Sequence, residues 1–257
     1  MLHKIFTTLL FFTILCGQQT VAAELFTAKS WLVSDLNGTI IDGEEIDKVR
    51  PIASITKLLT VMVVMDVNPD MGEKLKLTMK LQDRLPAKNQ MLSRGDLISM
   101  AIIHSSNRAA YTLCEHYPGG MVACVKAMND KLKKLKMEKS IVYEPTGLDK
   151  RNVSTAREVM TLTKAAAEYS NIVYASRKTE IKIQVKKKWF VFRNTNPMIG
   201  HYQNIIVSKT GYISDSGGCI TMLLDTSIGD RVVVILGSKN TKTRIPEAEF
   251  IYELYKD

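Results

Sequence analysis

The sequence predicts an α+β fold in which an antiparallel sheet is flanked by helices and carries an inserted all-α lobe. Short β-branched or aromatic runs lie at both ends of the chain, whereas its middle shows apolar residues mainly at helical spacing. The links between the C-terminal runs are too short for crossover helices, so we expect antiparallel strands. The two ends are therefore expected to pair into one sheet.

The N-terminal strands are predicted at Trp31 to Ser34 and Thr39 to Ile41, around an Asn37-Gly38 pair that favours a tight hairpin. The C-terminal strands are predicted at 181–185, 189–192, 205–208, 220–224 and 232–236, and a closing helix at 246–255.

The middle of the chain is predicted to be helical in several pieces. One helix is expected over 54–65, just after Pro51, and a long helical stretch over 96–137, broken near Ser105 and at 118–120. A further helix is expected over 154–170, whereas residues 70–93 are polar and irregular.

Composition fits an ordinary globular protein, and the length allows one large domain or two small ones. The 257 residues are 46% hydrophobic and 24% charged, which excludes a disordered tail or a fibrous repeat. The formal net charge of +9 favours anionic surfaces. The lysine runs at 131–136 and 186–188 are most simply solvated faces, and no nucleic-acid motif accompanies them, so we expect no nucleic-acid partner.

The first 23 residues are predicted to be a secretory signal peptide, which leaves residues 24–257 as the functional domain. A basic start at Met1 to Lys4 precedes an apolar run over 5–15, and Val21-Ala22-Ala23 offers small residues for cleavage. An uncleaved anchor and a lipidated Cys16 are the alternatives. We expect a periplasmic protein with no stable membrane span after cleavage.

Cys114 and Cys124 flank a turn between two helical stretches, so a disulfide between them is possible. It would stabilise the fold by about 2–3 kcal/mol on the loop-entropy model. Buried free thiols are the alternative. No metal-ligand spacing appears, and we expect no cofactor.

Ser54 and Lys57 lie three residues apart, so on a helix their side chains share one face. A serine hydroxyl needs a base to become a nucleophile, and a lysine is a base only when burial or a nearby cation lowers its pKa. The apolar residues that follow Lys57 are consistent with burial. The alternative is a helix capped by Ser54, with Lys57 in solvent.

Two further motifs follow in the chain. Ser105 and Asn107 lie at a helix-to-helix turn, where the hydroxyl can relay a proton and the amide can bind a peptide group; simple helix capping is the alternative. A similar Ser238-Lys239-Asn240 follows the last strand, out of order, and is discarded. Lys209-Thr210-Gly211 ends an apolar strand, where Lys209 and Thr210 can bind a carboxylate and Gly211 lets a substrate strand approach.

Three such motifs in this order are typical of penicillin-binding proteins and serine β-lactamases. The chain resembles the low-molecular-mass penicillin-binding proteins, which are serine D-Ala-D-Ala peptidases, and within them the penicillin-binding protein 7 type of D-alanyl-D-alanine endopeptidase. The short segment after Lys209 fits that type, because it leaves no room for the C-terminal domain and anchor of the carboxypeptidases. Other stretches that carry the resemblance are 50–58, 144–148, 154–156 and 192–196.

This resemblance implies roles for the motif residues and a substrate, the peptide stems of peptidoglycan, with β-lactam antibiotics as covalent inhibitors. Ser54 would form the acyl-enzyme, Lys57 would be the base and Ser105 would pass a proton to the leaving amine. The substrate would be bound by Asn107, Lys209, Thr210, Gly211, Arg193 and, through its backbone N–H, Tyr212. Arg193 could equally be a strand-surface residue. Lys209 is also expected to lower the pKa of Lys57.

Three alternatives remain beside the endopeptidase. A D-Ala-D-Ala carboxypeptidase would use the same residues, because the two activities differ only in what lies beyond the scissile bond. A class A β-lactamase would need a deacylating glutamate, for which Glu144 is the candidate, but the loop signature of those enzymes is absent. A cell-wall binding module with a decayed site is disfavoured because every catalytic position is filled.

Overall fold

The computed structural model describes residues 26–78 and 90–256. Its centre is a five-stranded antiparallel sheet in the order β2-β1-β11-β10-β9. The strands are β1 (Ser30–Asp35), β2 (Ile40–Glu44), β9 (Ile205–Ile213), β10 (Gly217–Leu224) and β11 (Arg231–Ser238). The N-terminal hairpin β1–β2 pairs with the last strand, β11, so the prediction that the two chain ends share one sheet is confirmed.

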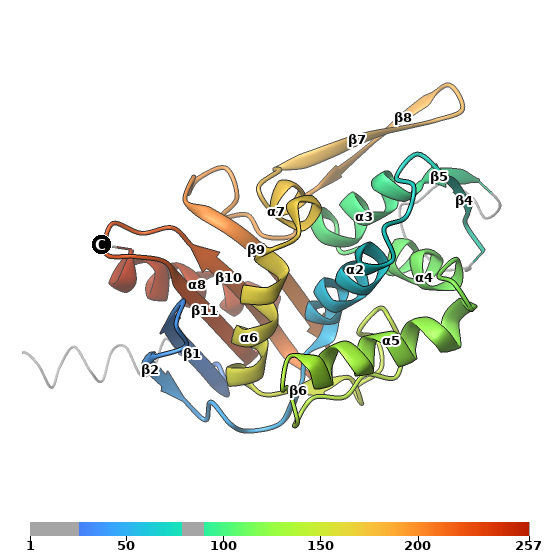
Figure 1. Cartoon of the computed structure of the whole chain (residues 1–257). Coiled ribbons are helices and arrows are strands. Elements are labelled where there is room, and N and C mark those ends of the chain that lie inside the picture. The colour runs from blue at the N-terminus through green and yellow to red at the C-terminus, as the bar shows by residue number, and fades with distance from the viewer. Residues whose placement is uncertain (1–25, 79–89, 257) are drawn as a thin grey trace, which may run out of the picture.

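Both faces of the sheet are buried, and β11 shows why. Val232, Val234 and Leu236 belong to the large core beneath the helical lobe, whereas Val233 and Ile235 belong to a smaller core on the other face. Helix α6 (Ala156–Ala167) packs on the first face and α8 (Thr241–Tyr255) on the second. Figure 1 shows the sheet between these two helices.

The helical lobe surrounds one buried helix, α2 (Thr56–Asp66), whose residues 56 to 64 are all buried. A single 3-10 turn, η1 (Ala53–Ile55), precedes it. Around it lie α3 (Arg94–Ile103), α4 (Asn107–Glu115) and α5 (Gly120–Lys134), as the sequence predicts. The loops around the lobe contain two small two-stranded sheets. One pairs β3 (Arg50–Pro51) with β6 (Val153–Ser154), and the other pairs β4 (Lys74–Lys76) with β5 (Met91–Ser93).

Three details differ from the prediction. Strands β7 (Glu180–Val185) and β8 (Lys188–Arg193) form a separate two-stranded sheet and do not pair with β9. Their buried face packs on α3 instead. A short helix, α7 (Ser170–Ser176), follows α6. Helix α8 begins at Thr241, five residues before the predicted start, because Asn240 and Thr243 form a reciprocal capping box.

Cys114 and Cys124 form a disulfide that joins α4 to α5, so the bridged alternative is confirmed. Cys219 is a buried free thiol. Every helix among the described residues is too short or too polar to span a lipid bilayer. The predicted signal peptide, residues 1–23, lies outside the described part of the chain.

Candidate active site

The structure brings the three predicted motifs together where the helical lobe meets the edge strand β9. Ser54 lies in η1, and Lys57 lies in the first turn of α2. Ser105 lies in the turn between α3 and α4, and Asn107 is the first residue of α4. Lys209, Thr210 and Gly211 lie on β9. The site therefore joins residues that are about 150 positions apart in the sequence.

Lys57 is the centre of this cluster and is fully buried. Its amine donates hydrogen bonds to Ser54 Oγ at 2.7 Å, Asn107 Oδ1 at 2.7 Å and the Thr146 carbonyl at 2.5 Å. Burial lowers the pKa of Lys57 to about 7, against a smaller opposing effect of the Glu144 charge. Near neutral pH, about half of the molecules therefore carry an uncharged amine beside the Ser54 hydroxyl.

The capping alternative is wrong at the Ser54 helix start, whereas at α4 a cap is present but is made by Ser106 rather than by Ser105 or Asn107. Ser54 makes no capping hydrogen bond to α2, and Lys57 is not in solvent. At α4 the cap is Ser106, whose hydroxyl accepts from the Ala109 N–H, and this leaves the Asn107 amide free to face Lys57. In the discarded motif, Asn240 caps α8.

Two residues of the site adopt a left-handed backbone that side chains rarely tolerate. Ala53, directly before Ser54, has φ +45°, and Ser105 has φ +57°. Such conformations cost about 1–3 kcal/mol each and persist only where the surrounding structure imposes them. They turn the two serines toward the cluster, which sequence spacing alone does not reveal.

Lys209 forms the opposite wall of the cluster and is almost completely buried. Its amine donates to Ser105 Oγ at 2.8 Å and to the Thr210 carbonyl at 2.9 Å. Burial lowers the pKa of Lys209 well below its usual value, and the charges of Lys57 and Arg244 add to this effect. Burial is the first cause of the lowered pKa of Lys57, and the Lys57 charge also lowers the pKa of Lys209. Because repulsion between two amines acts on both, the expectation that Lys209 lowers the pKa of Lys57 stays a prediction.

Gly211 lets the backbone of β9 lie against the Ser54 turn. A Cβ at this position would be 2.9 Å from the Ser54 nitrogen and 3.0 Å from the Ala53 Cβ, closer than side chains tolerate. Behind it, buried Arg244 donates to the Gly211 carbonyl at 2.7 Å. Arg244 was not predicted as a site residue, because the capping box at Asn240 marks the start of α8 but not which of its basic residues reaches β9.

The remaining predicted residues lie at the rim. Tyr212 follows Gly211 on β9 and is 45% exposed. Thr210 shares a hydroxyl–hydroxyl hydrogen bond of 2.6 Å with Thr195, a partner that the sequence analysis missed. Arg193 ends β8 with an exposed side chain that has no hydrogen-bond or ion-pair partner among the described residues. Its carbonyl lies 3.1 Å from the His104 ring.

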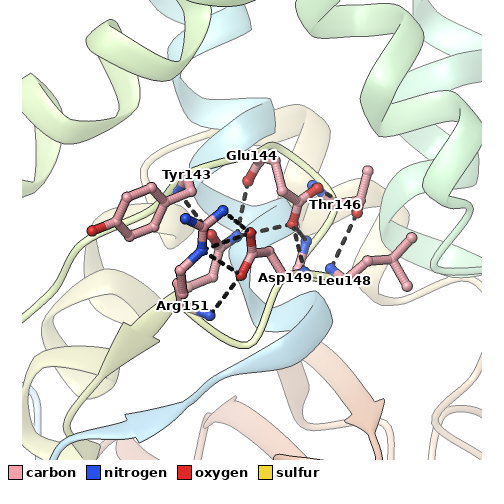
Figure 2. Close-up of polar contacts among 8 residues, drawn as sticks. Tyr143, Glu144, Thr146, Leu148, Asp149 and Arg151 are labelled. Atoms are coloured by element: carbon pink, nitrogen blue, oxygen red, sulfur yellow. Dashed lines mark hydrogen bonds and ion pairs between the residues drawn. The ribbon is translucent and has the colours of Figure 1, made fainter.

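Glu144 holds the loop whose Thr146 carbonyl accepts a hydrogen bond from Lys57. One carboxylate oxygen accepts from the Thr146 N–H at 2.7 Å and the other from the Gly147 N–H at 2.5 Å. Figure 2 shows the side chain turned into its own loop, beside Thr146, and Asp149 paired with Arg151. Thr60 of α2 donates to the Pro145 carbonyl at 2.7 Å, so the loop is fastened to the same helix as Lys57.

A profile of the peptidase S11 family, described as D-alanyl-D-alanine carboxypeptidase, matches residues 17–240. The chain is 39% identical over 203 residues to a D-alanyl-D-alanine endopeptidase of Escherichia coli K12, covering 75% of this chain and 66% of the relative. It is 35% identical over 229 residues to a protein of the same description from Pseudomonas aeruginosa PAO1, covering 85% and 74%.

Solved structures agree with this family. Penicillin-binding protein D2 from Listeria monocytogenes, in its cefotaxime-bound form, is 28% identical with a TM-score of 0.79, covering 89% of this chain and 97% of that one. The Streptomyces K15 DD-transpeptidase shares the fold with a TM-score of 0.81 at 20% identity, covering 89% and 96%.

Proposed function

The chain belongs to the peptidase S11 family and is a serine hydrolase, and from this premise we propose that it is a D-alanyl-D-alanine endopeptidase that cleaves cross-links in peptidoglycan. One observation carries the proposal: the buried Lys57 amine, with its pKa lowered to about 7, lies 2.7 Å from the Ser54 hydroxyl. This pair is a nucleophile with its base already in hydrogen-bond contact.

In the acylation step Ser54 Oγ attacks the carbonyl carbon of the D-Ala residue. The neutral Lys57 amine accepts the hydroxyl proton across the 2.7 Å contact, and the C–N bond of the substrate breaks as the Ser54 ester forms. Water then hydrolyses the ester and releases Ser54. The Thr146 carbonyl and Asn107 Oδ1 orient the amine throughout.

The leaving amine needs a proton, and Ser105 is the residue that we propose delivers it; Ser105 regains a proton from the Lys57 ammonium formed in the attack, which leaves Lys57 neutral again. Its hydroxyl accepts from Lys209 at 2.8 Å, so its own O–H remains available to point into the cleft. Ser105 therefore joins the turn between α3 and α4 to Lys209 on β9.

The oxyanion of the tetrahedral intermediate would be held by the backbone N–H groups of Ser54 and Tyr212. Gly211 supports this assignment because it brings the β9 backbone against the Ser54 turn. One lost donor in such a site costs about 3 kcal/mol of transition-state stabilisation.

Lys209, Thr210 and Arg193 are the candidate ligands for a substrate carboxylate. The Thr195–Thr210 contact orients the Thr210 hydroxyl, and the exposed Arg193 side chain lies two residues from Thr195 on the same rim. The Asn107 amide nitrogen is left to bind a peptide carbonyl, because its oxygen accepts from Lys57.

A carboxypeptidase is the second candidate, because the family description and a 26% identical relative from Bacillus subtilis carry that name. The two relatives of highest identity named above are endopeptidases, which favours the first. A β-lactamase is disfavoured, since Glu144 is occupied by the N–H groups of its own loop and directs no oxygen toward an acyl group on Ser54.

The proposal is tested with purified protein and a fluorescent penicillin. Wild type and the exposed-serine control Ser227→Ala should each take up about one equivalent of label, and Ser54→Ala should take up none. Digestion of cross-linked muropeptide dimers to monomers then identifies an endopeptidase, and loss of terminal D-Ala from pentapeptide monomers identifies a carboxypeptidase. An unlabelled wild type would refute the assignment of Ser54.

We also propose that the protein acts in the periplasm, where this substrate is found. The predicted signal peptide supports this location, as do its relatives in Gram-negative bacteria. Fractionation of cells should recover the mature protein, starting near Glu24, with the periplasmic contents; an intact N-terminus in the cytosol would contradict the proposal.

A further inference from the structure

The β7–β8 hairpin has one face that packs against the rest of the protein and one face that is exposed. Ile183, Val185 and Phe192 are buried on the face that packs against α3. Figure 1 shows the hairpin projecting beyond the helical lobe above α3. Because side chains alternate along a strand, the residues between the buried ones point away from the lobe, where no described element covers them.

This outer face combines exposed apolar side chains with a cluster of cations. Trp189 is 64% exposed and Val191 is 49% exposed. The strand register sets Trp189 opposite Gln184 and Val191 opposite Lys182. The turn adds exposed Lys186 and Lys187, and exposed Lys188 follows them as the first residue of β8, opposite Val185. We call the outer side chains together with these lysines at the hairpin tip the hairpin face: Lys182, Gln184, Lys186, Lys187, Lys188, Trp189 and Val191.

The charge of the hairpin face is almost entirely positive. Glu180 is the only acidic residue in the two strands and their turn, and it already pairs with Lys182 at 3.7 Å. Adjacent exposed apolar side chains rimmed by like charges mark an interaction surface. The partner must offer apolar surface for an indole ring and negative charge for the lysines.

The hairpin face is continuous with the rim of the active site. Arg193 is the last residue of β8, and its carbonyl contacts His104 next to Ser105. Trp189 lies four residues before Arg193, which is about 13 Å along an extended strand. A polymer that extends from the active site past Arg193 therefore meets Trp189 about 13 Å farther along β8.

We propose that the hairpin face binds the polymeric part of the substrate, a glycan strand with carboxylate-bearing peptide stems, beside the catalytic cleft. The apolar C–H face of a sugar ring fits the electron-rich face of Trp189. The stem carboxylates fit the turn lysines. This inference rests on the proposed function and extends it from the cleaved bond to the polymer that carries it.

The test compares polymer with small substrates. In the triple variant Lys186→Glu/Lys187→Glu/Lys188→Glu and in Trp189→Ala, release of peptides from intact sacculi should fall at least about tenfold, as for a binding hot spot. Fluorescent-penicillin labelling and cleavage of soluble muropeptide dimers should stay within about twofold of wild type, because these ligands are too small to reach the hairpin. Added salt should weaken wild-type binding to sacculi.

The matched control is Lys133→Glu/Lys134→Glu/Lys136→Glu, which makes the same charge change at exposed lysines at and just beyond the C-terminal end of α5. It should digest sacculi within about twofold of wild type. Equal losses in both triple variants would overturn the proposal and assign the effect to net charge. Unchanged sacculus digestion in the hairpin variants would overturn it as well.

Vesicles of anionic phospholipid provide the competing surface. If the hairpin variants lose vesicle binding but keep sacculus digestion, the face binds a membrane and the proposal is wrong. A wild type that digests neither sacculi nor soluble dimers refutes the proposed function and this inference with it. A wild type that digests the dimers and shows no dependence on Trp189 refutes the inference alone.

Discussion

The acylation rate of Ser54 should follow the neutral fraction of Lys57. With a pKa of about 7, half of the amine is neutral at pH 7. At the ordinary value of 10.5, only about one molecule in 3,000 would be neutral, so burial raises the reactive fraction by about three orders of magnitude. The rate constant should rise tenfold per pH unit on the acidic side and reach a plateau above neutrality, with the rate at pH 5.5 about 30-fold below that plateau.

The assay is the second-order rate constant for fluorescent-penicillin labelling between about pH 5.5 and 9.5. Lys57→Met should remove labelling across the range, whereas Lys134→Met, which replaces an exposed lysine of α5, should reproduce the wild-type profile. A flat wild-type profile, or a limb that still rises near pH 10, would show that Lys57 is not the base.

The same pKa shift fixes the sign of a stability effect. Lys57 has a lower pKa in the folded protein than in the unfolded chain, so between pH 7 and 10.5 the unfolded chain binds a proton that the folded chain lacks. Lys57 should therefore make the free energy of unfolding rise with pH over this window, by about 3 kcal/mol between pH 7 and 9.5 and about 5 kcal/mol for the whole shift. Lys209, whose pKa is also lowered, adds a rise of the same sign. Urea unfolding measures this rise, and an equal rise in Lys57→Met would refute its assignment to Lys57.

Three further predictions concern the support of the site. Gly211→Ala should slow penicillin labelling at least about tenfold by pushing β9 away from Ser54, whereas Gly95→Ala, whose Cβ would meet only ordinary contacts, should not; equal rates would show that β9 has room to move. Arg244→Met should slow labelling about tenfold through the freed Gly211 carbonyl, and an unchanged rate would exclude this support. The double variant Cys114→Ser/Cys124→Ser should lose about 3 kcal/mol in urea unfolding, as should reduced wild type; a loss below about 1 kcal/mol would mean that packing alone holds α4 to α5.

Much of the fold followed from local signals. Asn37-Gly38 predicted the first hairpin, because tight hairpin turns need a positive φ that glycine adopts readily. The structure agrees, since Gly38 has φ +91°. Thr155 caps α6 by accepting from the Glu158 N–H, as the sequence of that helix start suggested. The β7–β8 hairpin was placed in the wrong sheet, because alternation identifies a strand's buried face but not the element that covers it.

The site was predictable in its residues but not in its electrostatics. The spacing of Ser54 and Lys57 marked the pair, and both lie where the motif requires. Arg244 and the Thr146 carbonyl were missed, because a basic residue in a basic chain and a backbone oxygen leave no pattern. The burial of Lys209, which is the first cause of its lowered pKa, was also missed, since it depends on packing among distant segments.

By itself the sequence determined which groups are available: a hydroxyl and an amine one helical turn apart, and an apolar strand that ends in Lys209, Thr210 and Gly211. These are local properties, set by helical and strand periodicity. The tertiary structure decided that the Lys57 amine is fully buried and that the Thr146 carbonyl, 89 residues along the chain, accepts a hydrogen bond from it. It also decided that β9 packs against the Ser54 turn. The pKa of Lys57 depends on that burial, because only packing among distant segments can remove the solvent that would otherwise keep a lysine charged.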